Sequence, residues 1–339
     1  MPEEHKSDHT HQDISLKDLL DIQKWQEIQD DFSDITGICL RIVSPEGNLI
    51  ASSCEKATLC TEVLTNSPAK NRLCGTCLPT FLSGKAVVDK NLSFYCDAGM
   101  YNFISPLIAH HDKILGYLIM GPVILVMRQP KEAYETIAHE FSVELEDFWN
   151  ALLEIKAISF HYAQSLMKVI QNVAEYMLQS SSRGKEETYA ALPANTKEAL
   201  TKRFEAFLDV AFELSKADIG SVMSLPKDTN ELTIEAAKGI PDAIVKNTRV
   251  TLGNGIAGLA AEEGISLLLD NTVADNRLLH YFKRPHLNSS MVIPFKTEEG
   301  RVLGVLNVGA LNTSQVHFNK NTLQMMDTFA RLAAVSMQP

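Results

Sequence analysis

The spacing of apolar residues divides the first part of the chain into predicted helices and strands. From Ser15 the apolar positions recur at helical spacing, and Gly37 ends this region. Short apolar runs bounded by turn residues then predict strands. They are expected at 38–43, 49–51, 92–96, 102–109 and 114–126, with a helix over about 68–88. This order predicts a small antiparallel sheet flanked by helices, an α+β sensor-like domain over residues 15–130.

A longer apolar stripe follows the first domain. Between 131 and 180, apolar residues recur every three or four positions with a break near 141–145, so two helices are predicted and the second is long. The stripe of a long helix can seal a homodimer, which we expect here, or it can pack against its own domain. The polar segment 181–195 is predicted to be a linker.

Residues 196–339 predict a second domain of the same class. Helices are expected over about 196–214, at 256–263 and at 319–337. Strands are expected at 219–225, 231–238, 266–269, 291–295 and 302–309. The fold class is therefore α+β, with two sensor domains, each an antiparallel sheet flanked by helices, joined by a long helix. Residues 1–14 are polar and are predicted to form a disordered tail.

Composition and charge narrow the functional classes. The chain has 339 residues, of which 45% are hydrophobic, which is enough for two cores. The formal net charge of -11 argues against a nucleic-acid binder, because such proteins present basic surfaces. No apolar run reaches the roughly 20 residues of a membrane span, and the polar N-terminus has no apolar signal region. We therefore expect a cytoplasmic protein without direct contacts to nucleic acid or membrane.

The second domain resembles a GAF domain. The resemblance rests on the segments 252–259 (LGNGIAGL), 269–272 (LDNT), 275–277 (DNR), 289–294 (SSMVIP) and 302–308 (VLGVLNV). GAF domains bind cyclic nucleotides, tetrapyrroles, haem or other small molecules, and many only dimerise. The resemblance therefore implies the fold without fixing a ligand.

No cysteine follows Cys96, so two activities that depend on a cysteine in the GAF domain are not expected here. The cysteine that attaches bilin in phytochrome-like members has no counterpart here, and neither have the catalytic cysteines of methionine sulfoxide reductases with this fold. We therefore do not expect an enzyme. By residue type, His280, His286 and His317 could ligate haem, and the alternative for each is an ordinary surface or core histidine.

The first domain resembles a PocR-type sensory domain over about residues 14–170. The matching segments include 36–38 (TGI), 45–47 (PEG), 95–100 (YCDAGM), 104–107 (ISPL) and 115–121 (LGYLIMG). This family looks like a variant of the PAS domain and has been proposed to sense small hydrocarbon-derived molecules such as diols. The resemblance therefore implies a small-molecule ligand.

Cysteines of the first domain are candidates for a metal site. Four match the family pattern, one is an addition, and together they are Cys54, Cys60, Cys74, Cys96 and the additional Cys77. Thiolates in such number suit zinc or an iron–sulfur cluster. The alternatives are redox-active thiols without metal, or burial as small apolar side chains, which we expect for the remaining Cys39. A non-thiol ligand could come from Asp97, His110 or His111.

A ligand pocket of a PAS-like domain would lie between the sheet and its helices. Six residues are candidates to line it and are otherwise ordinary core: Tyr95, Met100, Tyr101, Phe103, Tyr117 and Met120. The sequence contains no phosphate-binding loop, dinucleotide-binding turn or helix-turn-helix pattern. We therefore expect a signalling sensor that binds a small molecule and acts on a separate output protein, such as a kinase or a transcription regulator. A thiol or metal-based redox sensor is the alternative.

Overall fold

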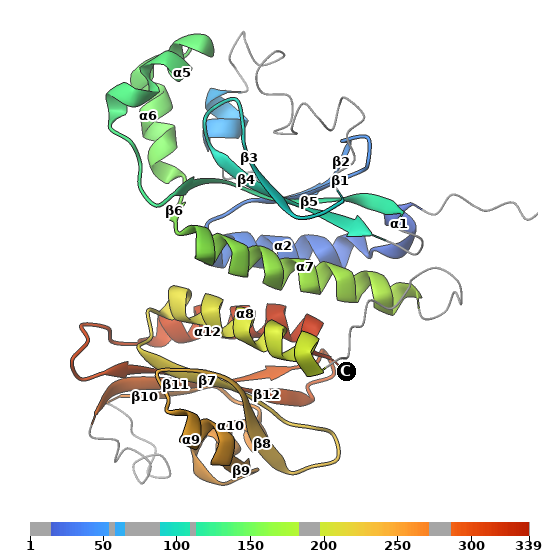
Figure 1. Ribbon diagram of the computed structural model, residues 1–339, viewed down its shortest axis with the longest axis vertical. Coiled ribbons are helices and arrows are strands. Elements are labelled where there is room, and N and C mark those ends of the chain that lie inside the picture. Colours follow the sequence, from blue (N-terminus) through green and yellow to red (C-terminus); the bar gives the residue numbers. More distant parts are fainter. Residues whose placement is uncertain are drawn as a thin grey trace, which may run out of the picture.

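The computed structural model consists of two α+β domains whose helices meet in the middle of the molecule (Figure 1). It describes residues 15–53, 58–64, 89–108, 113–182, 197–270 and 286–338. Each domain contains a mainly antiparallel sheet, so the fold class expected from the sequence is confirmed. The predicted tail at 1–14, the helix at 68–88 and most of the predicted linker lie outside the described residues.

The first domain is built on a sheet with the strand order β2-β1-β5-β4-β3, and a short β6 pairs in parallel with the end of β5. Its elements are α1 (Leu16–Leu19), α2 (Ile22–Thr36), β1 (Leu40–Val43), β2 (Leu49–Ser52), the π-helical turn η2 (Leu59–Val63), β3 (Leu92–Tyr95), β4 (Tyr101–Ile108), β5 (Ile114–Leu125), η4 (Lys131–Tyr134), α5 (Glu135–Glu140), α6 (Leu145–Glu154), β6 (Ala157–Ile158) and α7 (Phe160–Ser182). Helices α2 and α7 lie on the side of this sheet that faces the second domain (Figure 1).

Local signals in the sequence fix both ends of α2. The Asp21 carboxylate accepts a hydrogen bond from the backbone N–H of Lys24 at 3.1 Å, which caps the start of the helix. Gly37 ends it in the left-handed conformation, with a φ of 68°, and donates its N–H to the carbonyl of Ser33. The buried face of α2 carries Trp25 and Phe32, and it packs against the sheet.

The second domain has the strand order β10-β11-β12-β7-β8-β9, with antiparallel pairing throughout its described strands. Its elements are α8 (Lys197–Ser215), β7 (Ile219–Ser224), β8 (Glu231–Lys238), α9 (Asp242–Asn247), β9 (Arg249–Thr251), α10 (Gly255–Glu263), β10 (Leu267–Leu269), β11 (Leu287–Lys296), β12 (Val302–Leu311), α12 (Lys320–Ala334) and η5 (Val335–Met337). Helices α8 and α12 cover the face toward the first domain, and α9 and α10 cover the other face (Figure 1).

The helical region after β5 differs from the prediction of one long second helix. The chain leaves the helix after Glu154, forms β6 beside β5, and begins α7 at Phe160. Arg128 ends α6 by donating to the carbonyls of Leu152 (3.3 Å), Leu153 (2.7 Å) and Ile155. Apolar residues continue between α6 and α7 because β6 is itself partly buried. The spacing of apolar residues therefore did not reveal the break between the two helices.

Helix α7 packs against both domains of its own chain. It contacts β4 and β5 of the first sheet on one side and α8 on the other. Leu166, Ile170 and Val173 are fully or almost fully buried within one apolar core that continues from the first sheet to the second. The apolar stripe is therefore covered inside one chain, as in the alternative to dimerisation, and the homodimer stays a prediction.

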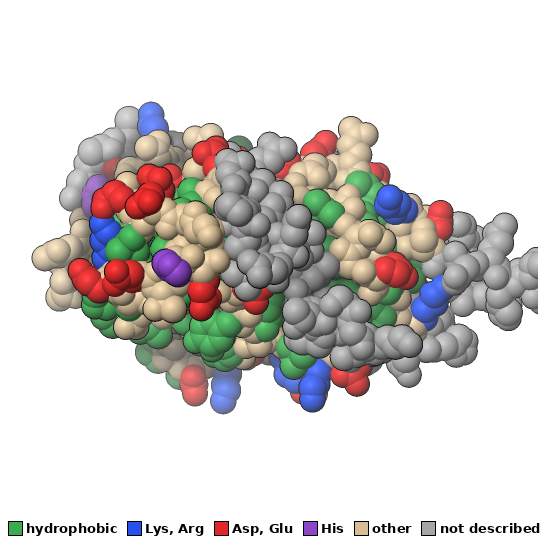
Figure 2. Space-filling model, turned by 90° about the horizontal axis from the view of Figure 1, so that it is seen from above, with side chains coloured by type: hydrophobic (Ala, Val, Ile, Leu, Met, Phe, Trp, Pro, Cys, Tyr) green, Lys and Arg blue, Asp and Glu red, His purple; other side chains and the backbone are tan. Residues whose placement is uncertain are grey.

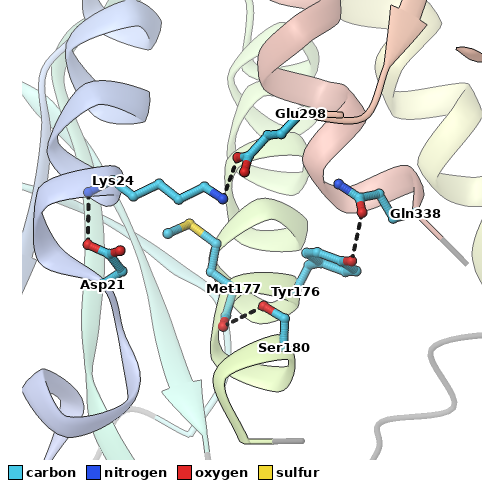
Figure 3. A network of polar contacts seen from close by, with 7 residues as sticks. All are labelled: Asp21, Lys24, Tyr176, Met177, Ser180, Glu298 and Gln338. Atoms are coloured by element: carbon cyan, nitrogen blue, oxygen red, sulfur yellow. Dashed lines mark hydrogen bonds and ion pairs between the residues drawn. The ribbon is translucent and has the colours of Figure 1, made fainter. Parts of the chain in front are cut away.

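Polar contacts at the edge of the domain interface add to this core (Figure 3). Lys24 of α2 forms an ion pair with Glu298, which lies in the turn after β11. The hydroxyl group of Tyr176 in α7 donates to the side chain of Gln338 at 3.1 Å. Exposed ion pairs contribute about 0–1 kcal/mol each, so burial of apolar surface is the main stabilising term at this interface.

The surface of the first domain is acidic around α5 and α6. Figure 2 shows acidic side chains gathered over this part of the molecule. Exposed residues of the region include Glu132, Glu135, Glu140, Glu144, Glu146 and Asp147. Such a surface repels the phosphates of nucleic acid, in keeping with the net charge. Among the described residues, no helix is long and apolar enough to cross a membrane.

The continuous core predicts that the two domains unfold together. Phe207 of α8 is fully buried, packs against Phe295 and Phe329 of the second domain, and its substitution by Ala should cost about 3–5 kcal/mol. Both tryptophans, Trp25 and Trp149, lie in the first domain. We expect Phe207→Ala to move the denaturant midpoint of tryptophan fluorescence together with that of far-UV circular dichroism.

The matched control is Ile265→Ala, which truncates a side chain of the same domain that is 43% exposed. This control should leave both midpoints within the range of an ordinary surface substitution, about 0.5 kcal/mol. A fluorescence midpoint that stays at its wild-type value while circular dichroism shows an earlier transition would mean that the domains unfold independently.

Candidate functional site

Aromatic side chains form a row between the first sheet and the start of α7. The rings of Tyr95 and Tyr101 are 3.9 Å apart between centroids, and those of Tyr101 and Phe103 are 6.4 Å apart. Phe103 in turn lies 5.7 Å from Phe160, the first residue of α7. Tyr95 is 63% exposed, whereas Phe103 and the nearby core residue Met120 are buried.

The other two expected ligand-lining residues lie elsewhere. Tyr117 is buried on the opposite face of the sheet, in a cluster with Val43, Ile104 and Ile119. Met100 is buried in a third cluster beside Phe148 of α6. The six residues are thus divided among three places in the first domain. Phe103 lines a cavity of about 360 Å³ next to Phe160 and Met167 of α7, and the other five are not part of that lining.

A buried polar pair on the Tyr117 side of the sheet was missed by the sequence reasoning. Arg41 of β1 is 8% exposed and donates hydrogen bonds to the Asn102 side chain and to the carbonyl of Gly121, each at 3.1 Å. Asn102 is fully buried in β4. A charged group inside the otherwise apolar strand LRIV is the sequence signal, because burying such a group is costly unless it is hydrogen-bonded.

Three of the six cysteines lie within the described residues. Cys39 is buried beside the first sheet, as expected. Cys60 is half-buried in η2, whose Leu59 and Leu64 belong to the same apolar cluster that Cys96 packs against. The ligand candidates outside the described residues are Cys54, Cys74, Cys77, His110 and His111. Within the described ranges, no group of three or more Cys, His, Asp or Glu side chains could hold a metal ion.

The second domain contains a cavity of about 420 Å³ between its sheet and the helices α9 and α10. This volume is within the range of natural ligand sites. Its walls are mostly apolar and include Met223, Ile234, Val250, Ile256, Ala257 and Met291. The polar lining residues are Ser221, Thr248, His286, Ser290 and Asn307, and the described lining contains no Lys, Arg, Asp or Glu.

One hydrogen bond organises the polar part of the cavity wall. Asn307 of β12 donates from its side-chain amide to the hydroxyl oxygen of Ser221 in β7, at 3.3 Å. These two residues face each other across the paired strands. His286 also lines the cavity, whereas His317 is exposed and lies 3.9 Å from Asp270. The third histidine considered for haem, His280, is outside the described residues.

Glycines of the segment LGNGIAGL place α10 over the cavity. Gly253 and Gly255 adopt positive φ angles of 76° and 64°, which lets the chain turn sharply into the helix. A Cβ atom on Gly258 would lie 2.3 Å from the carbonyl oxygen of Thr251. Only glycine therefore allows α10 to approach β9 this closely.

Arg203 of α8 and Glu175 of α7 bring opposite charges to the domain interface. Arg203 is 9% exposed and donates to the carbonyl of Ser336 at 2.9 Å. Burial raises the pKa of Glu175, and hydrogen bonding by Gln171 and the charges of Lys168 and Arg203 oppose this shift. Burial likewise lowers the pKa of Arg203, and the charge of Glu175 counteracts it.

Two family models together match most of the chain. A model for the sensory domain found in PocR matches residues 18–182, and a GAF domain model matches residues 198–338. The chain is a PocR sensory domain followed by a GAF domain. Both resemblances noted in the sequence are thereby confirmed. The PocR match includes α6, β6 and α7, and the two sensory domains give the chain a role in signal transduction.

Solved GAF-fold structures resemble the GAF half of the chain. The GAF domain of an Acinetobacter phosphoenolpyruvate-protein phosphotransferase is 16% identical, with 53% of this chain and 94% of that chain covered and a TM-score of 0.37. The GAF-B domain of DevS from Mycobacterium smegmatis is 26% identical, with 41% and 92% covered and a TM-score of 0.32. A free methionine-R-sulfoxide reductase from Neisseria meningitidis is 16% identical, with 53% and 92% covered and a TM-score of 0.34. No protein of curated function matches the sequence.

The raised pKa of Glu175 predicts a pH-dependent loss of stability. Below the ordinary value of 4.5 this residue is protonated in both the folded and the unfolded chain. Above it the unfolded chain ionises first, so the stability associated with the protonated form is lost as the pH rises through the higher folded pKa. We expect Glu175→Gln to be more stable than wild type at pH 7 and similar to it near pH 4.

Thermal unfolding at a series of pH values measures this difference. Glutamine keeps the carbonyl oxygen that accepts from Gln171, at 2.7 Å in the native protein, and removes only the charge. Glu140→Gln, at an exposed position of α5, is the control and should follow the wild-type profile. A Glu175→Gln protein that is less stable than wild type at pH 7 would show that attraction to Arg203 outweighs burial.

Proposed function

We propose that this protein is a cytoplasmic sensor that binds small molecules and passes the signal to a separate output protein. In this proposal the PocR domain receives one small molecule, and α7 conveys its effect to the GAF domain. The matched PocR model is described as sensory, which supports the first part. The packing of α7 on both domains supports the second. The output partner, such as a kinase or a transcription regulator, and a homodimeric assembly are further parts of the proposal.

The observation that carries the proposal is the cavity of the GAF domain. Its described lining is apolar with a few hydroxyl, amide and imidazole groups, and it offers no charged side chain. An ion inside such a wall would lose its hydration without gaining a counter-charge. The ligand is therefore an uncharged, largely apolar molecule of small size that can bond to Asn307, Ser221 or Ser290.

The protein acts as a binding module, not as an enzyme. Among its structural neighbours are free methionine-R-sulfoxide reductases, from Neisseria meningitidis and from Thermoplasma acidophilum. The chain has no cysteine after Cys96, so its GAF domain lacks the thiol that such a reduction would need.

Cavity filling tests the proposed binding site. We expect Nile red, an uncharged apolar dye, to bind the wild-type protein with an increase in fluorescence. Ala257→Phe places a phenyl group in the cavity from α10 and should weaken this binding at least tenfold. Ala243→Phe makes the same change at an exposed position of α9 outside the lining, and should bind as wild type does. Equal dye binding by both variants would show that the dye does not bind in this cavity, and the cavity would then no longer support the proposal.

A metal or thiol redox sensor is the second candidate function. It is favoured by two half-buried thiols of the PocR domain: Cys96 packs against one apolar cluster, and Cys60 is next in sequence to Leu59 of the same cluster. Two thiols alone do not complete a zinc or iron–sulfur site. The site would therefore include Cys54, Cys74 or Cys77, in segments outside the described residues. Its ligands would be thiolates, so binding would release protons and tie the cluster to the fold of this domain.

Metal and sulfide analysis of anaerobically purified protein tests this alternative. If the thiols hold a metal centre, Cys60→Ser and Cys96→Ser should each lose most of the bound metal. Cys39→Ala, which changes a thiol buried beside the sheet, should retain it. A colourless, metal-free wild-type protein whose thiols react at ordinary rates would rule out both the metal centre and the redox sensor.

A further inference from the structure

Asp209 of α8 stands where the two domains and the rim of the GAF cavity come together. One carboxylate oxygen, Oδ1, lies 2.5 Å from Nζ of Lys238, a residue of the same domain at the end of β8. The other oxygen, Oδ2, accepts a hydrogen bond from the hydroxyl of Ser165 and lies 3.3 Å from Nε2 of His161, both in α7. The Asp209 side chain is 19% exposed, so these contacts are partly shielded from water.

Lys238 connects this carboxylate to the cavity. The next three residues, Gly239, Ile240 and Pro241, all line the cavity. Gly239 has a φ of 68°, and a Cβ atom there would lie 2.6 Å from the side chain of Ile219, so this turn requires glycine and lies close against β7. A ligand that moves this turn therefore moves Lys238 as well.

The contacts of Asp209 with α7 connect it to the PocR domain. His161 and Ser165 lie in the first two turns of α7, next to Phe160. The ring of Phe160 packs on Phe103 of β4, within the aromatic row of the first sheet. The N-terminal part of α7 thus touches the first sheet on one side and the Asp209 carboxylate on the other.

We propose that Asp209 couples ligand occupancy of the GAF cavity to the seating of the N-terminal part of α7, with Lys238 and the His161–Ser165 pair as its two sets of partners. This inference rests on the proposed function of the cavity. The Asp209 carboxylate contacts the ammonium group of Lys238 at the cavity rim and the side chains of Ser165 and His161 on the neighbouring domain. When a ligand shifts Lys238, the carboxylate interacts more strongly with α7 or moves away with the lysine. In either case the two sites acquire a coupling free energy, which is the physical content of allostery.

Hydrogen–deuterium exchange of the full-length protein measures this coupling. In wild type, saturating Nile red should change the amide exchange rates of residues 160–168 by several-fold. Asp209→Asn removes the charge with little change of shape, and Lys238→Met removes the cation while keeping an apolar stem over the ring of Phe212. Both variants should still bind Nile red at saturation but should lose most of the exchange response in α7.

A matched control separates coupling from a general effect of charge on α8. Lys202→Met removes one partner of the exposed Lys202–Glu198 pair of the same helix, and should respond to the dye as wild type does. Dye binding without any change of exchange in residues 160–168 of wild type, or a full response in Asp209→Asn, would overturn this inference alone. Failure of wild type to bind the dye would instead refute the cavity, and the coupling with it.

Discussion

Burial of α7 between two sheets is the interaction on which the rest of the structure depends. Its apolar residues close the core of the first domain and, with α8, the space between the domains. The ion pairs at the edges of this interface are exposed, whereas Asp209 of α8 contacts Ser165 and His161 of α7 in a partly buried position. Because exposed ion pairs contribute little, the relative position of the domains depends on side-chain packing, which tolerates few intermediate arrangements.

This packing explains why the two domains have different kinds of candidate site. On the face of the first sheet toward α2 and α7 most side chains belong to the core, and Phe103 and Phe160 also line a cavity of about 360 Å³ beside the start of α7. In the second domain, α8 and α12 cover one face, while α9 and α10 stand off the other and leave a cavity. The buried Arg41–Asn102 pair marks the remaining face of the first sheet as chemically distinct, because charge there requires hydrogen-bonding partners.

Much of the fold could be predicted from the sequence because its signals are local. The expected strand 114–126 corresponds to β5 (Ile114–Leu125), and the end of α2 at Gly37 follows from the left-handed conformation that glycine readily adopts. The break between α6 and α7 could not be predicted, because Arg128, which terminates α6, is distant in sequence and the apolar spacing continues across the break.

The sites were harder to predict than the fold. Residue type on a strand suggests what could bind a ligand, but its face depends on register. Tyr101 and Phe103, two residues apart in β4, share one face of the sheet, whereas Tyr117 pairs with Pro106 of the same strand and lies on the other face. The cavity-lining pair Ser221 and Asn307 consists of common polar residues on separate strands, and only the pairing of β7 with β12 brings them together.

The attachment of α7 to the first sheet has a mechanical consequence. Backbone hydrogen bonds from Ile124 to Lys156 and from Val126 to Ile158 fix β6 to the end of β5, immediately before α7 begins. The 23 residues of α7 form a rod whose start is fixed to the first sheet and whose far end packs against η5, where Tyr176 donates to Gln338. At 1.5 Å per residue it is about 34 Å long, so a tilt of about 5° at its anchored end displaces the far end by about 3 Å. A rearrangement too small to alter the first sheet visibly is thereby enlarged to roughly the width of an atom where the rod approaches the C-terminal segment.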